Sequence, residues 1–342
     1  MSITKSMKDQ TRKKVPTEIL EKYALPEYLS DFQLGMFIHL IEWKWNNLTR
    51  EKGNFRGRDY DSILPESLQQ KWLPLYPAIV DEVRKLDFKK HRHFGHMASS
   101  QVACLNLFFP LLRDKETANQ VFPLIKPDFR ELATCELKNG YSFEYCHESN
   151  PLNDHTPHAG TDADVAIAYY NTSGELSLWL IEHKLTEDEF TTCGGYRTKH
   201  NKSKGDCESN QLILNDHNKC YYTKYCNYKY WEISDRSGMY DPISLSKKMK
   251  CPFLGGENQL WRNQLLGYAV KEKGHFKKVH FSVVHHPDNP DLARSMNSYS
   301  QLLKNMDIFS SYTSKDFIRA ASSINDHSIQ SWIKWYSELY RI

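Results

Sequence analysis

Two apolar runs joined by a short polar segment constrain the fold of this chain more than any other feature. Residues 163–170 and 176–184 are rich in aliphatic and aromatic side chains, and the segment NTSGE between them contains Ser173-Gly174. Runs of this length predict β-strands, and a short polar connection makes such strands antiparallel. The sequence therefore predicts a hairpin whose second strand ends in Glu-His-Lys.

The length of the loop determines which side chains face each other across this hairpin. If residues 171–175 form the loop, counting outward places Asp164 opposite Glu182. Lys184 shares a face with Glu182, because side chains two residues apart on a strand point the same way, and His183 points to the opposite face. Three charged side chains are thus expected at one end of an apolar face.

Two carboxylates in this position favour a bound cation. Directly opposed side chains have Cβ atoms about 4.5–5.5 Å apart, where like charges repel. Mg²⁺, or Mn²⁺, is the natural occupant of an oxygen site, and Lys184 can orient water or offset charge on a phosphate. A bulge would shift the register and make Asp162 the alternative ligand. The competing interpretation, a charged strand end in water, does not explain the third charged residue.

The order of these residues resembles the PD-(D/E)xK nuclease superfamily, in which an Asp on one core strand precedes (D/E)-x-K on the next. Ala163, rather than proline, precedes Asp164. Gln264 and Tyr268 match the Q-x-x-x-Y signature of the branch that contains RecB-like and Cas4 nucleases. These two residues are four positions apart, on one face of a predicted helix.

This resemblance implies an α/β fold of the restriction-endonuclease type, with a central mixed sheet flanked by helices. It implies hydrolysis of DNA phosphodiester bonds by metal-activated water, with Asp164 and Glu182 as metal ligands and Lys184 as a catalytic residue. A further glutamate often completes the metal site in this superfamily, and both Glu144 and Glu148 qualify, with Glu144 taken as the ligand. Gln264 and Tyr268 would shape the site or hold the DNA backbone.

The rest of the chain is divided into three regions by its pattern. Residues 1–95 predict a helical accessory region, and residues 96–342 predict the nuclease domain with an irregular insertion at about 191–255. Ser99 or Ser100 is expected to cap a buried helix. Asn139-Gly140 predicts a hairpin turn within residues 135–148. A helix is expected near residues 257–276, a strand near 277–286 and a helix at the C-terminal end.

The insertion contains five of the eight cysteines, with no C-x-x-C pair. Cysteines at this density in a polar segment favour a bound [4Fe-4S] cluster, or alternatively a structural Zn²⁺ ion. The favoured ligands are Cys193, Cys207, Cys220 and Cys251, with Cys226 as the alternate and His200 or His217 as substitutes for one of them. The competing interpretation is a set of scattered reduced thiols.

Basic and aromatic residues alternate in the same insertion. Lysine and arginine contact phosphates, and tyrosine or tryptophan can stack on exposed bases. The residues expected to bind nucleic acid are Arg197, Lys199, Lys202 and Lys204. A solvated basic loop is the competing interpretation. His155 and His158 precede the Asp164 strand and could lie at the mouth of the site, although loop histidines beside prolines are usually only exposed.

Composition narrows the function less than these motifs do. The 342 residues carry a net charge of +3, which excludes neither nucleic acid nor a small substrate. No secretory signal or membrane-spanning run is visible, so we expect a cytoplasmic protein with reduced cysteines. The expected partners are DNA and other defence or repair subunits, and a homo-oligomer is compatible with the sequence. The rival functions are an RNA-directed nuclease and an inactive nucleic-acid-binding module.

Overall fold

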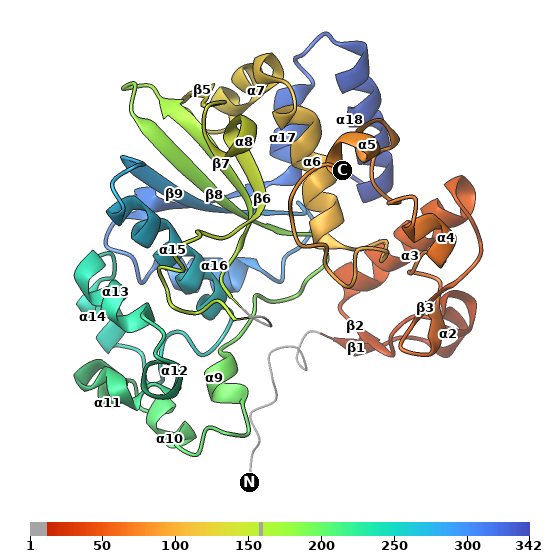
Figure 1. Ribbon diagram of the computed structural model, residues 1–342. Coiled ribbons are helices and arrows are strands. Elements are labelled where there is room, and N and C mark those ends of the chain that lie inside the picture. Colours follow the sequence, from red (N-terminus) through yellow and green to blue (C-terminus); the bar gives the residue numbers. More distant parts are fainter. Residues whose placement is uncertain (1–11, 157–159) are drawn as a thin grey trace.

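A six-stranded mixed sheet forms the centre of the molecule (Figure 1). The computed structural model describes residues 12–156 and 160–342, and His158 lies outside this range. Strands β10, β9, β8 and β7 lie side by side in that order, and both β5 and β6 pair with the free edge of β7. The strands are β5 (Phe129–Leu132), β6 (Tyr141–Tyr145), β7 (Ala163–Asn171), β8 (Leu176–Lys184), β9 (Lys278–His285) and β10 (Phe309–Thr313).

The β7–β8 hairpin has the register that the sequence predicts. Tyr170 pairs with Leu176 and Val165 pairs with Ile181, so the next step along the ladder sets Asp164 opposite Glu182. Asn171 fixes the turn, because its side-chain oxygen accepts hydrogen bonds from the N–H groups of Ser173 and Glu175. Gly174 supplies the positive φ of 80° that this turn requires.

Helices cover both faces of the sheet and bury its two sets of alternating side chains. The first face packs on α6 (Ser100–Leu112), α7 (Lys115–Val121), α17 (Ser314–Ala321) and α18 (His327–Tyr340). The second face packs on α15 (Glu257–Glu272) and α16 (Ala293–Ser300). Ala166 and Ala168 on this second face leave room for α15, whose Gly267 lies so close that an added Cβ would be 3.0 Å from Val279. The predicted α/β fold, a mixed sheet flanked by helices, is confirmed.

The N-terminal region packs onto this core. Its elements are β1 (Lys13–Lys14), α2 (Thr17–Tyr23), β2 (Tyr28–Leu29), α3 (Asp31–Asn47), β3 (Gly53–Phe55), β4 (Arg58–Tyr60), α4 (Glu66–Gln69), η1 (Pro77–Ile79) and α5 (Val80–Val83). Ser30 and Gln33 form a capping box that starts α3. Met36 and Leu40 of α3 belong to the same hydrophobic core as α6 and β8. Helices are its main regular elements, as expected, beside two small two-stranded sheets.

Some predicted elements are confirmed and one is wrong. Ser99 caps α6 through the N–H of Val102, and the expected helix and strand near residues 257–286 are α15 and β9. The hairpin predicted around Asn139-Gly140 does not form, because β5 and β6 pair with β7 and not with each other. Residues 137–140 all have positive φ, so the turn signal marks a tight connection between two strands on the same edge.

The insertion folds into short helices that lie beside α15 (Figure 1). They are α9 (Gly194–Arg197), α10 (Lys204–Cys207), α11 (Asn210–Asn215), η3 (His217–Lys219), α12 (Tyr221–Cys226), α13 (Tyr230–Ser237) and α14 (Pro242–Ser246). The remaining elements are η2 (Phe122–Leu124), α8 (Leu137–Gly140) and η4 (Met306–Ile308). Within residues 12–156 and 160–342, no helix is both long and apolar enough to cross a bilayer.

Asn106 of α6 hydrogen-bonds both to the N-terminal region and to α18. Its substitution therefore tests this packing. Asn106 is fully buried, accepts from Tyr76 N–H, and donates to Pro74 O and to the Tyr340 hydroxyl at 3.1 and 2.9 Å. Asn106→Leu would leave these partners unsatisfied and lower the free energy of unfolding by about 3 kcal/mol. Tyr340→Phe, which removes one bond, should cost about 1 kcal/mol. Urea unfolding measures both, and parent-like stability of Asn106→Leu would contradict the packing.

Candidate active site

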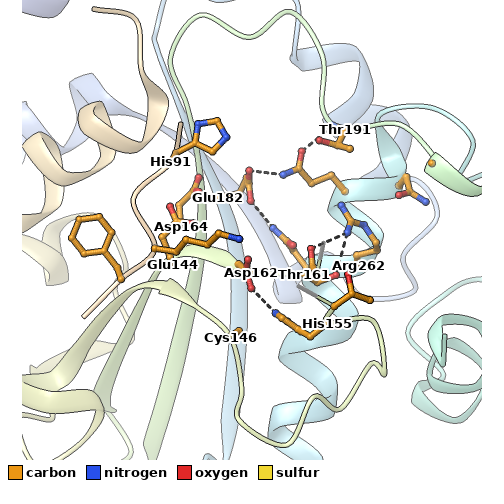
Figure 2. A pocket seen from close by; sticks show the side chains of 18 of the residues that line it. His91, Glu144, Cys146, His155, Thr161, Asp162, Asp164, Glu182, Thr191 and Arg262 are labelled. Carbon is orange, nitrogen blue, oxygen red and sulfur yellow. Dashed lines mark hydrogen bonds and ion pairs between the residues drawn. The ribbon is translucent and has the colours of Figure 1, made fainter. Parts of the chain in front are cut away.

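A cleft of about 910 Å³ opens where β7 and β8 carry their charged residues (Figure 2). Its walls come from the segment 87–91, the ends of β6 and β7, the α15 helix and the start of the insertion. Asp164, Glu182 and Glu144 all line it, so the structure brings together the three carboxylates predicted as metal ligands. Glu148 is exposed outside this cleft, so of the two candidate glutamates only Glu144 lines it.

Glu182 is buried, with only 2% of its surface exposed. Donors from three residues hold its carboxylate. Its Oε1 accepts from Gln259 Nε2 at 2.6 Å and lies 2.8 Å from Lys184 Nζ, and its Oε2 accepts from Asn263 Nδ2 at 2.7 Å. Each carboxylate oxygen has two lone pairs. Oε2 therefore keeps one lone pair that a cation in the cleft could use.

Asp164 is oriented by the backbone of the neighbouring strand. The N–H of His183 donates to Asp164 Oδ2 at 2.6 Å, and in the described part of the chain Oδ1 accepts no hydrogen bond. Burial raises the pKa of Asp164 well above its ordinary value, and the nearby Glu182 and Glu144 carboxylates raise it further. A bound cation would offset this cost, because it favours the charged form.

Glu144 reaches the cleft through a strained backbone. Its φ of 49° lies in the left-handed region, which non-glycine residues rarely adopt and which is concentrated at functional sites. Gln101 Nε2 donates to Glu144 Oε1 at 2.7 Å and holds the side chain. Burial raises the pKa of Glu144 to about 7, against the effect of the Gln101 bond and with help from Asp162 and Glu182.

Lys184 lies behind Glu182 and does not line the cleft itself. Burial alone would lower the pKa of Lys184, but the carboxylates of Glu182, Glu187 and Asp164 outweigh that effect and raise it, so the ammonium stays charged. His183 points to the other face, where its ring packs edge-on against Phe108 and burial lowers its pKa to about 3. Its side chain is remote from the cleft, as predicted, although its N–H orients Asp164.

These groups fit Mg²⁺ better than a metal that needs a closed protein cage. Among the described residues, the three carboxylates do not bring one oxygen each within 4.8 Å of one another. Mg²⁺ usually takes only one or two carboxylates and fills its other positions with water and substrate oxygens. The lining residues that the structure describes include five carboxylates against three Lys or Arg, so the cleft favours cations.

The polar face of α15 differs from the predicted one. Gln264 is buried outside the cleft, and the Tyr268 hydroxyl donates to the backbone carbonyl of Arg236. Neither residue lines the cleft, so the structure does not bring the predicted pair to the carboxylates. Gln259 and Asn263 reach Glu182 instead, and like the predicted pair they are four positions apart. Because the apolar pattern of this helix is weak, the sequence alone did not indicate which polar face is turned to the sheet end.

Comparison with known families accords with this geometry. The family described as Restriction Endonuclease associating with ARP matches residues 38–341. The chain belongs to this family. The match begins inside α3, so the restriction endonuclease family pattern includes most of the region predicted to be accessory. No curated protein and no solved structure shows detectable similarity to the chain.

The insertion of this restriction endonuclease family member brings the four favoured cysteines together. The N–H of Cys251 donates to Cys207 O at 3.0 Å, and the N–H of Cys193 donates to Leu254 O at 3.0 Å. Gly194 and Gly195 pack directly on Tyr222 and Tyr221, the residues that follow Cys220. All four thiols are free.

The four thiols lie near enough to one another to raise the pKa values of three of them. Burial raises the pKa of Cys193 to about 11 and of Cys207 to about 12, and charge on neighbouring cysteines adds to both shifts. Burial also raises the pKa of Cys251, where Cys220, Cys193 and Cys207 each contribute. Cys226, the alternate, is not among the groups that act on Cys251.

The remaining predicted residues are dispersed. Arg197 lines the cleft, whereas Lys199 and Lys202 are exposed outside it and Lys204 lies over the Tyr196 ring. His217 contacts Ile213 O and Asp235 through its two ring nitrogens, and His200 is exposed. His155 does lie at the mouth of the cleft, as considered from the sequence.

Metal binding at the carboxylates should be visible in thermal unfolding. A raised folded-state pKa means that Glu144 contributes stability below about pH 4.5 that is lost as the pH rises through about 7. At pH 8 without metal, Glu144→Gln should therefore be more stable than the parent by on the order of 2 kcal/mol.

Adding Mg²⁺ should raise the melting temperature of the parent and raise that of Glu144→Gln or Asp164→Asn much less. Equal shifts in all three proteins would contradict the site.

Proposed function

We propose that this protein is a Mg²⁺- or Mn²⁺-dependent nuclease that hydrolyses DNA phosphodiester bonds. The observation that carries the proposal is the convergence of Asp164, Glu182 and Glu144 in one cleft, with Lys184 paired to Glu182. The family match, whose description names a restriction endonuclease, supports the reaction class. Kinship to the RecB-like and Cas4 branch is a weaker part of the proposal, because Gln264 and Tyr268 lie away from the cleft.

The roles of the side chains follow from their contacts. A bound divalent cation lowers the pKa of water and neutralises charge on phosphate oxygens. Asp164 and Glu144 would offer it their open oxygens, and Glu182 its remaining lone pair. Gln259 and Asn263 would keep the Glu182 carboxylate in place while the cation binds. Lys184, kept charged by the neighbouring carboxylates against the effect of burial, would stabilise negative charge that develops at the phosphate.

The substrate is proposed to be DNA, with RNA as the alternative. Three basic side chains, Lys89, Arg197 and Arg262, line the cleft and could contact a phosphate backbone. Backbone contacts of this kind do not discriminate DNA from RNA. Parallel assays on duplex DNA, single-stranded DNA and RNA separate the two, and a role in restriction, defence or repair depends on DNA being cleaved.

The family description also names an association with ARP. We propose a protein partner on that basis, in keeping with the expected link to other defence or repair subunits. Co-purification of the tagged chain with an ARP partner encoded in the same genome would support this association.

We also infer that the four clustered cysteines hold a [4Fe-4S] cluster, with Zn²⁺ as the alternative. No three of their sulfurs lie within 4.8 Å of one another among the described residues. Tetrahedral Zn²⁺ needs sulfurs about 3.8 Å apart, and an iron–sulfur cube holds them farther apart. The N–H of Tyr196 donates to Cys193 Sγ, the kind of contact that tunes cluster thiolates. The site would staple the insertion that forms one wall of the cleft.

Replacing the central side chains tests the nuclease directly. Asp164→Ala and Lys184→Ala should each reduce Mg²⁺-dependent cleavage of plasmid DNA at least about 100-fold, because each removes a ligand or a charge that acts on the reacting phosphate. Circular dichroism should show that both variants remain folded. Cleavage at the parent rate by both variants would overturn the assignment.

The corrected face of α15 gives a matched comparison. Asn263→Ala removes the donor to Glu182 Oε2 and should slow cleavage about 10-fold or more. Tyr268→Phe, on the same helix, should cleave like the parent, because its hydroxyl bonds Arg236 O and interacts with Glu272, and neither group lines the cleft. The reverse ranking would restore the role predicted for the Q-x-x-x-Y pair.

Anaerobic purification tests the cysteine site. The parent should be brown, absorb near 400 nm and contain about four irons, as expected for a cluster on four thiolates. Cys207→Ser and Cys251→Ser should lose the colour, whereas Cys226→Ser and Cys135→Ser should keep it. A colourless parent whose Zn²⁺ is lost in Cys207→Ser and Cys251→Ser would support the alternative, and a parent whose metal content is unchanged by these substitutions would contradict both.

A further inference from the structure

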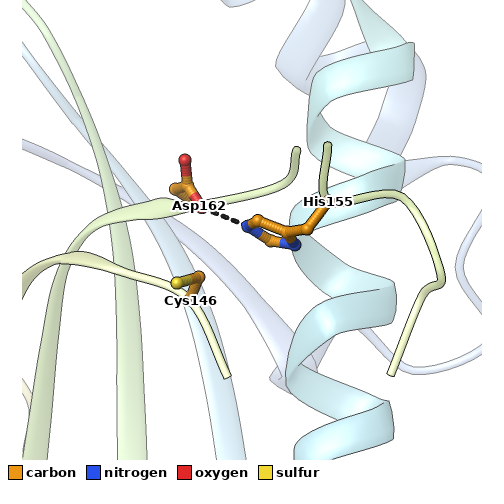
Figure 3. Close-up of side chains that lie close together, drawn as sticks. All are labelled: Cys146, His155 and Asp162. Carbon is orange, nitrogen blue, oxygen red and sulfur yellow. Dashed lines mark hydrogen bonds and ion pairs between the residues drawn. The ribbon is translucent and has the colours of Figure 1, made fainter. Parts of the chain in front are cut away.

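A second group of metal-ligand side chains lies at the rim of the cleft, away from the four cysteines. Cys146, His155 and Asp162 each present one ligand atom, and these atoms lie within 4.8 Å of one another (Figure 3). All three residues line the cleft beside Asp164 and Glu182. Nothing in the PD-(D/E)xK pattern above accounts for this group.

The sheet itself brings two of these side chains together. Tyr145 of β6 pairs with Ala163 of β7, so one further step along the ladder sets Cys146 opposite Asp162. The loop between them turns back at Asn150, whose side-chain oxygen accepts from the N–H groups of Asp154 and His155. The same loop is anchored at Leu152, which is 1% exposed. The position of His155 is thus built into the fold.

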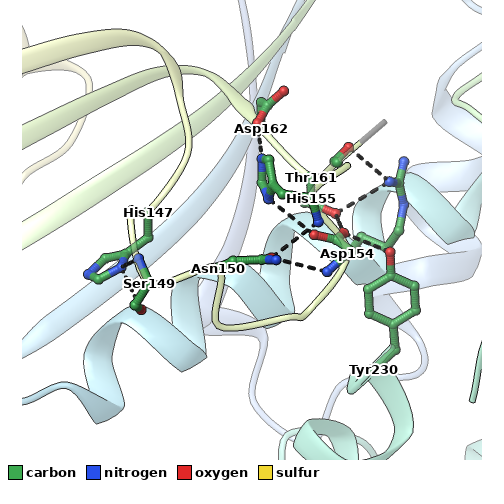
Figure 4. A network of polar contacts seen from close by, with 10 residues as sticks. His147, Ser149, Asn150, Asp154, His155, Thr161, Asp162 and Tyr230 are labelled. Carbon is green, nitrogen blue, oxygen red and sulfur yellow. Dashed lines mark hydrogen bonds and ion pairs between the residues drawn. The ribbon is translucent and has the colours of Figure 1, made fainter. Parts of the chain in front are cut away.

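His155 is oriented as metal-bound histidines are. Its Nε2 faces the rim and lies 2.7 Å from Asp162 Oδ1, while its Nδ1 lies 3.3 Å from Asp154 Oδ1 (Figure 4). Asp154 is 1% exposed, and its Oδ2 accepts from the hydroxyls of Tyr230 and Thr161. In the described part of the chain Asp154 Oδ1 has no hydrogen-bond donor with good geometry. A proton on His155 Nδ1 would supply that donor, so this tautomer is favoured. A carboxylate behind the histidine in this way fixes the tautomer that leaves Nε2 for a metal.

We propose that Cys146, His155 and Asp162 bind a zinc-type divalent ion at the rim of the cleft. One sulfur, one imidazole nitrogen and one carboxylate oxygen suit Zn²⁺ and do not suit Mg²⁺, which prefers oxygen. Zn²⁺ needs these atoms about 3.3–3.8 Å apart, within reach of small side-chain rotations. Burial and Asp162 raise the pKa of the Cys146 thiol, and a bound cation would reverse that effect.

Three protein ligands leave the fourth position of a tetrahedral ion open. All three ligands line the cleft, so this position is available to water or, if the proposed nuclease function holds, to a phosphate oxygen of the substrate. The ion would also reduce the excess of negative charge in the cleft. It is separate from the Mg²⁺ site, which has only oxygen ligands.

Cobalt binding to the full-length protein tests this site. Chelator-treated parent should bind one Co²⁺ more per chain than Cys146→Ser and His155→Gln, and the difference should carry the thiolate-to-cobalt charge-transfer band. Cys135→Ser is the matched control, since Cys135 is also an exposed free thiol but lies outside the cleft, and it should bind like the parent. The four-cysteine site contributes equally to all of these proteins.

Two further variants separate the possible outcomes. Asp154→Asn should keep the stoichiometry and weaken Co²⁺ and Zn²⁺ binding about 10–100-fold, because it disturbs only the residue behind His155. Asp164→Ala should lose cleavage and keep this binding, so that the failure of one proposal is not the failure of the other. If Cys146→Ser and His155→Gln bind as much metal as Cys135→Ser, the group is only a hydrogen-bonded bridge and the proposal is wrong.

Discussion

The pairing of Asp164 with Glu182 across the β7–β8 hairpin is the constraint on which the rest of the site depends. The Asn171 turn sets the register, and the register brings two carboxylates together at the end of an apolar face. Repulsion and burial make this arrangement costly without a cation, which is why the surrounding groups are donors: the His183 N–H, Lys184, Gln259 and Asn263. The cleft, the strained Glu144 and the wall of the insertion are organised around this pair.

Local sequence rules predicted the hairpin and its charged end because strand alternation and loop length leave one register. The same rules located α6, α15 and β9. The hairpin at Asn139-Gly140 was wrong for a physical reason. A turn signal indicates that the chain reverses locally, but it does not say which strand each arm will pair with. The second predicted arm became β6, which pairs with β7, whereas the first arm forms no strand and β5 ends before it.

Side chains that depend on tertiary orientation were harder to predict. Gln264 and Tyr268 have the right spacing, but the rotation of α15 turns Gln259 and Asn263 toward Glu182. Both Glu144 and Glu148 qualified from the sequence, and only the fold shows that Glu144 lines the cleft whereas Glu148 does not. The cysteines of the insertion could be singled out by their density, whereas Cys146, His155 and Asp162 meet only through the paired ends of β6 and β7 and the loop that carries His155.

If the proposed function holds, one divalent ion binds between the opposed carboxylates of β7 and β8. Crystals soaked in Mn²⁺ and measured at its absorption edge test this most directly. An anomalous peak is expected about 2.1–2.2 Å from oxygens of both Asp164 and Glu182. A peak only at Cys146, His155 and Asp162, or no peak in the cleft, would contradict it.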